Sequence, residues 1–263
     1  MLRKFSALVA ATFGLSLLAG VLPATAATGQ YGYDISWPQC NGSTSTFTGV
    51  NAPASFAILG VNDGKAKTTN PCLMSQISQA SGLTVSYYQN TANPGSRYWP
   101  YGQSSPAVCP SKVKHLTEDQ IKACSEDYGY NAAEYGYNYG TSNPSTIPNA
   151  ASSGWWLDVE SANSWSRDTL ANIADIQGGL IYLNQQGAPL AGIYTNSSSW
   201  SSITGSDTAD FTGVRWWAPG LVSSNPSGTE LTGACGTHSL FGGSYGPRYI
   251  QYTQTYDTNY DCG

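Results

Sequence analysis

Charge and histidine are scarce in this chain of 263 residues. Only 10% of the residues are charged, and His115 and His238 are the only histidines. The six cysteines include no Cys-x-x-Cys pair, so the sequence lacks the usual ligand pattern of a structural zinc site and we expect no metal. With two histidines, the chain also offers few candidates for the base that a serine or cysteine nucleophile needs. These absences argue against zinc proteins and against nucleophilic hydrolases.

Long apolar runs are missing beyond the N-terminus. Arg3 and Lys4 precede a mostly apolar stretch from Phe5 to Leu22, and Ala24-Thr25-Ala26 supplies a small-residue cleavage site. This pattern predicts a secretory signal peptide at residues 1–26 and a secreted, extracellular protein. No later run of about 18 apolar residues could span a bilayer, so we expect no membrane segment.

Basic residues are too few for a polyanionic partner. Without Arg3 and Lys4, the 11 basic residues become 9 against 16 acidic ones, a formal net charge of −7. Nucleic acids and anionic lipids are bound through clustered Lys and Arg, so we expect neither as a partner. The segment Gly136-Tyr137-Asn138-Tyr139-Gly140 lacks the following Lys of a nucleotide-binding loop, and we expect no cofactor.

Residues 27–263 have the length of one α/β barrel domain, and no internal repeat or linker divides them. We expect a monomer. All six cysteines lie in this part, and an even number in an exported protein predicts three disulfides. Six cysteines allow fifteen pairings, between which the sequence does not decide. The cysteines are Cys40, Cys72, Cys109, Cys124, Cys235 and Cys262.

Strand-sized runs alternate with helical patterns along the chain. Helices are predicted over Leu73–Ser81, over Thr117–Tyr139 with Thr117 and Gln120 spaced as a capping box, and over Arg167–Gln186 before Gly187. Seven strands are predicted at Tyr31–Ser36, Phe56–Asn62, Leu83–Gln89, Gly154–Glu160, Leu190–Asn196, Val214–Ala218 and Arg248–Thr253.

This alternation implies parallel strands joined by right-handed crossovers, in a doubly wound sheet or a barrel. Because the chain has room for an eighth strand, we predict an α/β fold: a single TIM-like (β/α) barrel. The helical signal fades after residue 204, so we expect incomplete helices or loops between the last strands. Residues 90–116, with Pro94, Pro100, Pro106 and Pro110, are predicted to form a long rim loop held by Cys109.

Two acids share one face of the strand predicted at residues 154–160. Side chains alternate along a strand, so Trp156, Asp158 and Glu160 point one way and Trp155 and Leu157 the other. A pair of carboxyl groups in the mouth of a barrel is suited to the acid/base cleavage of a sugar chain. The alternative is a solvated surface pair, as most Asp-x-Glu triplets are.

Further acids are expected at the same rim. Asp34 lies at the end of the first predicted strand, and Asp257 and Asp261 follow the last one. Asp34 could instead cap the turn before Pro38, and the other two could be turn residues. Whether Asp257 or Asp261 is the C-terminal rim acid stays open.

The chain resembles the family 25 glycoside hydrolases, the secreted lysozymes or N-acetylmuramidases. The order and spacing of six segments carry the resemblance: Asp34-Ile35-Ser36 with Trp37 and Gln39, Phe56–Val61, Leu157–Glu160, Gly192–Asn196 with Trp200, Trp217-Ala218, and Gln251–Thr253 with Asp257. Other segments, including Ser36–Cys40 and Tyr128–Ala133, are similar to an actinobacterial branch of secreted proteins. Pro38, Cys40 and the long rim loops depart from the lysozyme pattern.

The resemblance implies a secreted glycosidase that cleaves β-1,4-linked N-acetyl amino sugars of peptidoglycan. Glu160 would be the general acid, Asp158 would stay ionised and orient the N-acetyl group, and Asp34 and Asp257 would tune both. Aromatic faces pack against sugar rings, and we expect substrate binding by Trp156, Tyr87, Tyr194, Trp217 and Gln251. The alternative is a lectin-like barrel that binds glycans through the same acidic rim without cleaving them.

Overall fold

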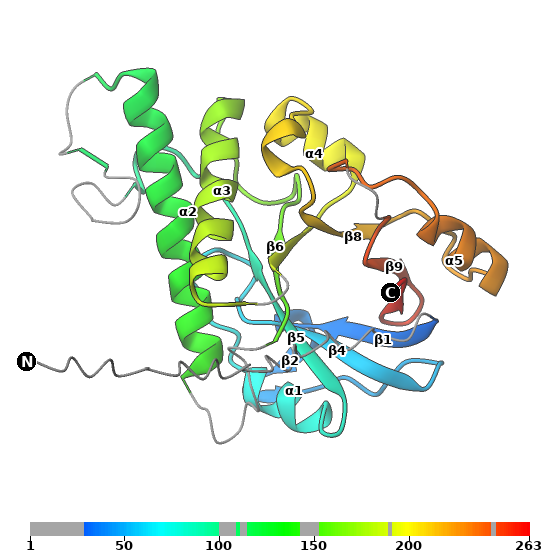
Figure 1. Cartoon of the computed structure of the whole chain (residues 1–263). Helices are drawn as coiled ribbons and strands as arrows, with labels where there is room; N and C mark the ends of the chain where they lie inside the picture. The colour runs from blue at the N-terminus through cyan, green and yellow to red at the C-terminus, as the bar shows by residue number, and fades with distance from the viewer. Residues whose placement is uncertain (1–28, 100–108, 111–114, 143–152, 189–190, 243–245) are drawn as a thin grey trace, which may run out of the picture.

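The computed structural model describes residues 29–99, 109–110, 115–142, 153–188, 191–242 and 246–263. Within them, eight strands close into a barrel, as the sequence predicts (Figure 1). The predicted signal peptide and residues 100–108 and 111–114 of the predicted rim loop lie outside the described residues. None of the helices in the described ranges is both long and apolar enough to cross a membrane.

The barrel contains all seven predicted strands and one more. The strands are β1 Gln30–Ile35, β4 Ala54–Gly60, β5 Thr84–Asn90, β6 Trp155–Asp158, β7 Ala191–Tyr194, β8 Arg215–Pro219, β9 Tyr249–Thr253 and β10 Asp257–Asp261. Their order around the barrel is β1-β10-β9-β8-β7-β6-β5-β4, closed by the pairing of β1 with β4. The additional strand, β10, runs antiparallel to both neighbours, whereas all other pairs are parallel. A small hairpin, β2 Cys40–Asn41 and β3 Thr44–Ser45, follows β1.

Within the described residues, five α-helices surround the barrel: α1 Leu73–Gln79, α2 Glu118–Thr141, α3 Thr169–Gln185, α4 Ser197–Thr204 and α5 Gly228–Cys235. The predicted capping box is confirmed, because Thr117 Oγ1 accepts from Gln120 N and Gln120 Oε1 accepts from Thr117 N. Asp168 caps α3, which therefore begins two residues after the predicted start. After residue 204, where the helical signal fades, the described α-helix is α5, which is eight residues long. Figure 1 shows α2 and α3 side by side against the barrel.

The alternation along β6 divides the core into two layers. Trp155 faces the helices, with its ring 5.1 Å from those of Tyr87 and Tyr137. Trp156 faces the barrel interior, 5.9 Å from the Trp217 ring and 5.4 Å from that of Tyr249. The interior is therefore filled with aromatic rings beneath the rim, a packed core rather than a pore.

Glycines allow α2 and α3 to approach each other closely. A Cβ added at Gly129 would overlap the carbonyl oxygen of Asp175, and one added at Gly178 would overlap that of Glu126. Both neighbours are backbone atoms, which cannot rotate away as a side chain can. The contact therefore depends on residues without a side chain at these positions.

Gly178→Ala should lower the free energy of unfolding by about 1–3 kcal/mol, the usual consequence of overpacking a tight contact. The control is Gly233→Ala in α5, where an added Cβ would meet open space, so the helix preference for Ala should leave stability unchanged or slightly higher. Urea unfolding of the three proteins measures the difference. Equal stability of both variants would show that α2 and α3 are not in close contact.

Three disulfides form, as the even cysteine count predicts: Cys40–Cys72, Cys109–Cys124 and Cys235–Cys262. Cys40–Cys72 ties the segment after β1 to the start of α1. Cys109–Cys124 ties residue 109 of the predicted rim loop to α2. Cys235–Cys262 ties the end of α5 to the residue after β10, so each bond fixes a connection at the barrel's periphery.

Candidate active site

Four acids come together at the C-terminal rim of the barrel. Asp34 lies near the end of β1, Asp158 is the last residue of β6, and Glu160 follows two residues later. Asp257 is the first residue of β10, and because this strand is antiparallel, its start lies at the rim where the parallel strands end. The side chains of Asp34 and Asp158 are 7% and 4% exposed, whereas Glu160 and Asp257 are half-buried.

A hydrogen-bond network from neighbouring strands holds Asp34. Its Oδ2 accepts from Gln251 Nε2 at 2.9 Å and from Asn259 Nδ2 at 2.7 Å. Gln251 Oε1 in turn accepts from the Tyr194 hydroxyl at 2.8 Å, and Asn259 Oδ1 accepts from Trp217 Nε1 at 2.7 Å. The amides are thereby oriented so that each points an N–H group at the carboxylate.

The carboxyl groups of Asp158 and Glu160 lie close enough for the charge of Glu160 to act on Asp158. A proton on either carboxyl group would allow it to donate a hydrogen bond to the other. Asn90 Nδ2 donates to Asp158 Oδ2 at 2.7 Å and fixes the buried member of the pair. The backbone after β6 is held as well, because Trp165 Nε1 donates to the Glu160 carbonyl oxygen at 2.7 Å.

Burial is the main cause of raised pKa values at this rim. It raises the pKa of Asp34 to about 7, with the charges of Asp257 and Glu160 adding to the effect and the bonds from Gln251 and Asn259 opposing it. Burial also raises the pKa of Asp158 well above its usual range, with the charge of Glu160 as the next cause. The site therefore retains protons at neutral pH.

The pKa of Glu160 is raised as well. Burial raises its pKa, as does the charge of Asp257, while the interaction with the Asp158 carboxyl group lowers it. The resemblance implies an ionised Asp158, whereas burial favours a protonated Asp158, the more buried of the two.

The pKa of Asp34 predicts a pH-dependent stability. The folded protein keeps this proton up to about pH 7, whereas the unfolded chain releases it near the ordinary value of 3.8. Between these values the folded state binds more protons, so the free energy of unfolding should fall as the pH rises. Asp34→Asn should reduce this fall by an amount on the order of a few kcal/mol, measured by urea unfolding between about pH 4 and pH 8. An unchanged pH dependence in the variant would contradict the raised pKa.

Several solved lysozymes and muramidases have the same architecture as this chain. The GH25 lysozyme of Aspergillus fumigatus superposes with a TM-score of 0.54 at 15% identity, covering 90% of this chain and 95% of its own. The chain has the fold of the family 25 lysozymes. The bacterial lysozyme of Streptomyces coelicolor gives a TM-score of 0.55 at 16% identity, covering 90% and 93%, and the muramidase of Acremonium alcalophilum gives 0.52 at 15%, covering 89% and 94%.

A family model described as Lysozyme-like protein 1 matches residues 114–232. No curated protein sequence matches the chain. Identities this low relate the folds, and the chemistry of this chain depends on its own residues. The resemblance to the family 25 lysozymes is thus confirmed at the level of the fold.

Two of the five residues predicted to bind substrate lie in the acidic network of this barrel. Gln251 contacts Asp34 directly, and Tyr194 contacts Gln251. The charges of Glu160, Asp34 and Asp158 act on the Tyr194 hydroxyl and, after burial, raise its pKa further. Both side chains are therefore part of the rim.

The other three do not face the rim. Trp156 and Trp217 are each 1% exposed within the barrel interior, where they support the floor beneath the acids. Tyr87 lies on the opposite face of β5, among the residues that pack between barrel and helices. The prediction for Tyr87 is wrong by one residue, since Tyr88 points into the barrel and its hydroxyl is influenced by Asp34, Asp158 and Asp257.

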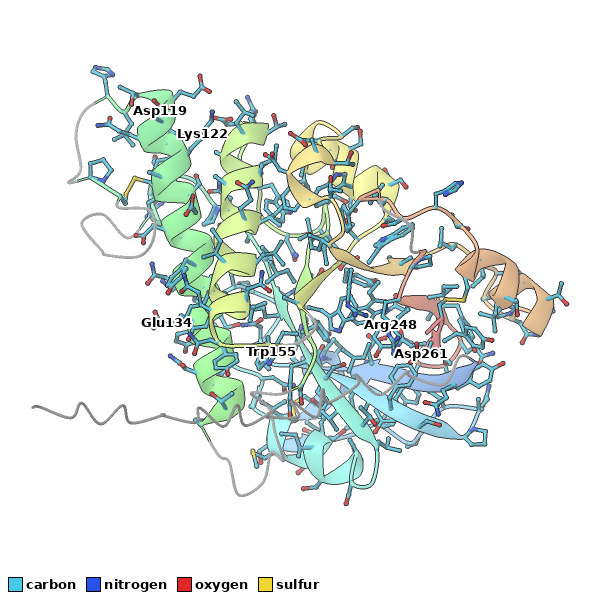
Figure 2. The ribbon with its side chains drawn as sticks, in the orientation of Figure 1. Asp119, Lys122, Glu134, Trp155, Arg248 and Asp261 are labelled. Carbon is cyan, nitrogen blue, oxygen red and sulfur yellow. A yellow bond between two sulfur atoms is a disulfide. The ribbon has the colours of Figure 1, made fainter. Side chains whose placement is uncertain are left out.

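The rim acid at the C-terminus is Asp257, and the expectation for Asp261 is wrong. Asp261 ends the antiparallel β10, so it lies at the opposite end of the barrel. There its Oδ2 accepts from Arg248 Nη2 at 2.7 Å (Figure 2). Asp257 Oδ1 instead accepts from Thr253 Oγ1 at 2.6 Å.

An open groove of about 730 Å³ begins beside Asn90, the residue that holds Asp158. Segments that follow the ends of β4, β5 and β6 line it. Among the lining side chains, Tyr98, Tyr128 and Trp165 offer aromatic surface, and Asn163 Nδ2 also donates to the Asp158 carbonyl oxygen at 3.2 Å. The groove therefore lies next to the Asn90–Asp158 hydrogen bond and is lined by three aromatic side chains.

Asn90 and Asn259 were not found from the sequence. The predicted third strand stops at Gln89, one residue before Asn90, although strand alternation places residue 90 on the face of Tyr88. Asn259 lies in the strand that was not predicted at all. For Asn90 the missing information is where the strand ends, and for Asn259 it is the strand itself.

Proposed function

We propose that this protein is a secreted glycoside hydrolase that cleaves β-1,4-linked N-acetyl amino sugars of cell-wall peptidoglycan. The single observation that carries the proposal is the convergence of Asp34, Asp158, Glu160 and Asp257 at one rim of the barrel, beside an open groove. A general acid must hold its proton at the working pH and lie within reach of the substrate. The fold shared with family 25 lysozymes and muramidases supports the same chemistry.

Glu160 is the proposed general acid. It is less buried than Asp158 and lies beyond the end of β6, so its carboxyl group can reach the glycosidic oxygen of a sugar chain in the groove. Proton transfer to the leaving oxygen allows the bond to the anomeric carbon to break. The raised pKa values of the two carboxyl groups keep a proton available for this step.

Asp158 is the proposed partner of the substrate N-acetyl group. When Glu160 is protonated and Asp158 is ionised, the Asp158 carboxylate is held by Asn90. It can then accept a hydrogen bond from the acetamido N–H of the substrate. This contact orients the acetamido oxygen towards the anomeric carbon in a substrate-assisted route. Asp34 and Asp257 raise the pKa of the pair by their charges, which keeps the proton available.

The proposal is tested by incubating the purified protein with peptidoglycan and analysing the soluble products by mass spectrometry. Cleavage should release fragments with new reducing ends on N-acetyl amino sugars. The lectin-like alternative gives saturable binding without new reducing ends at any pH, and that result would contradict the proposal.

Export is part of the proposed function, since its substrate lies outside the cell. We expect cleavage after Ala26, so N-terminal sequencing of the protein collected from culture medium should begin at Ala27. Retention of the full chain within the cells would contradict the proposed location.

A further inference from the structure

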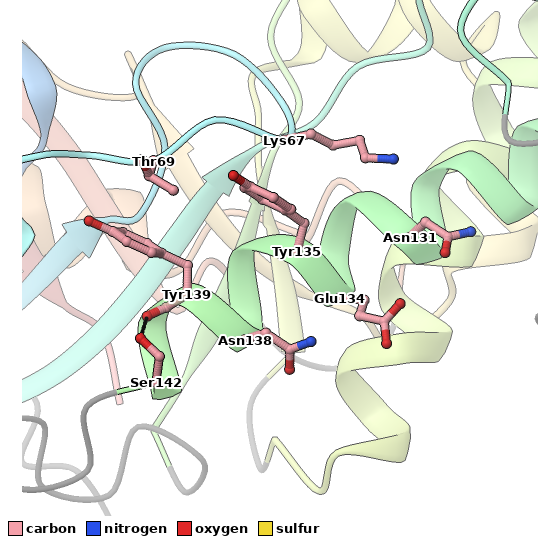
Figure 3. Close-up of a pocket in the computed structure, with 8 residues that line it drawn as sticks. All are labelled: Lys67, Thr69, Asn131, Glu134, Tyr135, Asn138, Tyr139 and Ser142. Carbon is pink, nitrogen blue, oxygen red and sulfur yellow. Dashed lines mark hydrogen bonds between the residues drawn. The ribbon is translucent and has the colours of Figure 1, made fainter.

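A second cavity lies beside the groove, between residues 63–69 and the outer face of α2. It has a volume of about 470 Å³. Figure 3 shows Lys67 extending from this loop above α2, and the Tyr135 and Tyr139 rings extending from the helix towards the loop, with Tyr139 on the side of Thr69. We call it the side pocket, and its lining residues are Lys67, Thr69, Asn131, Glu134, Tyr135, Asn138, Tyr139 and Ser142.

The side pocket and the groove share a wall. Lys65 and Ala66 line the groove, and the next residue, Lys67, lines the side pocket. The Lys67 ammonium lies over the Tyr128 ring, 5.6 Å from its centroid, and Tyr128 lines the groove. A ligand in the groove therefore needs to extend only past Lys67 to enter the side pocket.

The loop holds Lys67 in a fixed place. Its backbone has a φ of 60°, a left-handed conformation that side chains other than Gly or Asn rarely adopt. Thr68 stabilises the loop through two hydrogen bonds. Its hydroxyl donates to the Lys65 carbonyl oxygen at 2.6 Å and accepts from the Asp63 amide at 2.9 Å. Asn62 Nδ2 also donates to the Thr68 carbonyl oxygen at 3.0 Å.

The residues that line the side pocket provide a positive charge, a negative charge and amide groups. Lys67 and Glu134 form no ion pair within the described ranges, so each can bind a charge of the opposite sign. Asn131 and Asn138 each offer an amide donor and acceptor. Tyr135 is 42% exposed and offers a ring face. A neutral sugar would use neither charge, whereas a short peptide carries a carboxylate, amide groups and often an amine.

We infer that the side pocket binds the short peptide attached to a cell-wall glycan whose sugar chain occupies the groove. The inference rests on the proposed function and adds a specificity to it. Lys67 binds the peptide carboxylate, the two asparagines bind its amide groups, and Glu134 accepts an amine. The protein then prefers peptide-bearing glycans to unsubstituted chains of the same sugars.

The test measures dissociation constants by calorimetry in the Glu160→Gln background, so that no ligand is consumed. The ligands are a peptide-bearing peptidoglycan fragment, a peptide-free oligomer of N-acetylglucosamine, and the free peptide. Lys67→Asn removes the charge and keeps a residue that tolerates the left-handed backbone. It should weaken binding of the peptide-bearing fragment about tenfold, the usual effect of losing one charge-assisted hydrogen bond. Binding of the peptide-free oligomer should not change.

Tyr135→Ala is the second variant, and Lys122→Gln on the same helix is the control. Figure 2 shows Lys122 near the start of α2 and Glu134 towards its other end. The control should bind all ligands as the parent does. Thermal unfolding checks that each variant is folded, and both altered side chains are outside the core.

Equal weakening for both glycans, or none for the peptide-bearing one, would overturn the inference. The free peptide provides an independent arm: its titration should shift NMR signals of Asn131 and Asn138, and unshifted signals would also overturn it. Lys67-dependent binding of the peptide-bearing fragment by a wild-type protein that releases no reducing ends would contradict the proposed function and support the side pocket.

Discussion

Replacing Glu160 with Gln is expected to lower the rate of peptidoglycan cleavage by about 10²–10⁴-fold, the usual contribution of a general acid. The amide has the same shape but cannot give a proton to the leaving oxygen. The variant should stay folded, because the substitution removes a charge whose repulsion raises the pKa values of Asp34 and Asp158. Initial rates of reducing-end release measure the effect.

The matched control is Glu118→Gln, the same substitution at an exposed position in the first turn of α2. It should leave the rate unchanged. If Glu160→Gln retained the parental rate, another group would have to donate the proton, and the roles assigned to Asp158 and Glu160 would be wrong.

Arg248→Met is expected to lower the free energy of unfolding by about 3–5 kcal/mol, because it leaves a buried charge without its partner. Arg248 Nη2 lies 2.7 Å from Asp261 Oδ2, and the two side chains are 11% and 4% exposed. Burial raises the pKa of Asp261, while the hydrogen bond from Gly263 N and the charges of Arg248 and Arg215 lower it. Urea unfolding near neutral pH measures the loss.

Lys122→Met provides the comparison at an exposed pair. Lys122 Nζ lies 2.8 Å from Glu118 Oε1, nearly the same separation, but both side chains are exposed to solvent. Exposed pairs contribute little, so this variant should unfold at about the same urea concentration as the parent. Equal losses in the two variants would show that burial does not determine the strength of the Arg248–Asp261 pair.

The architecture was accessible from sequence because its main signals are local. Apolar runs of strand length, the Thr117 capping box and the alternation along Trp155–Asp158 each depend on residues near one another in the chain. Alternation alone places Trp156 and Asp158 on one face of β6, and the barrel interior confirms this for Trp156. The C-terminal rim then follows from the parallel direction of the strands.

The last strand was missed because it lacks such a signal. Asp257-Thr258-Asn259-Tyr260-Asp261 contains no apolar run, and its polar residues are buried through contacts with distant partners. Asn259 is fully buried because it bonds to Asp34 and Trp217. Without the strand, its direction was unknown, so Asp257 and Asp261 could not be assigned to opposite ends of the barrel.

The sequence also does not determine which face of β5 points into the barrel. Its residues alternate between Val85, Tyr87 and Gln89 on one face and Ser86, Tyr88 and Asn90 on the other, and each face carries one tyrosine and one amide. Nothing local distinguishes them. The register with β6, which pairs Asn90 with Asp158, decides that Tyr88 and Asn90 face the acids.

The central claim is that the acids at the C-terminal rim act on a sugar chain lying in the adjoining groove. The most direct measurement is a crystal structure of the Glu160→Gln protein with a bound peptidoglycan oligosaccharide. We expect the glycosidic oxygen within hydrogen-bond reach of the residue 160 side chain and an acetamido N–H against Asp158. A sugar chain bound elsewhere on the protein, with both side chains out of contact, would contradict the account.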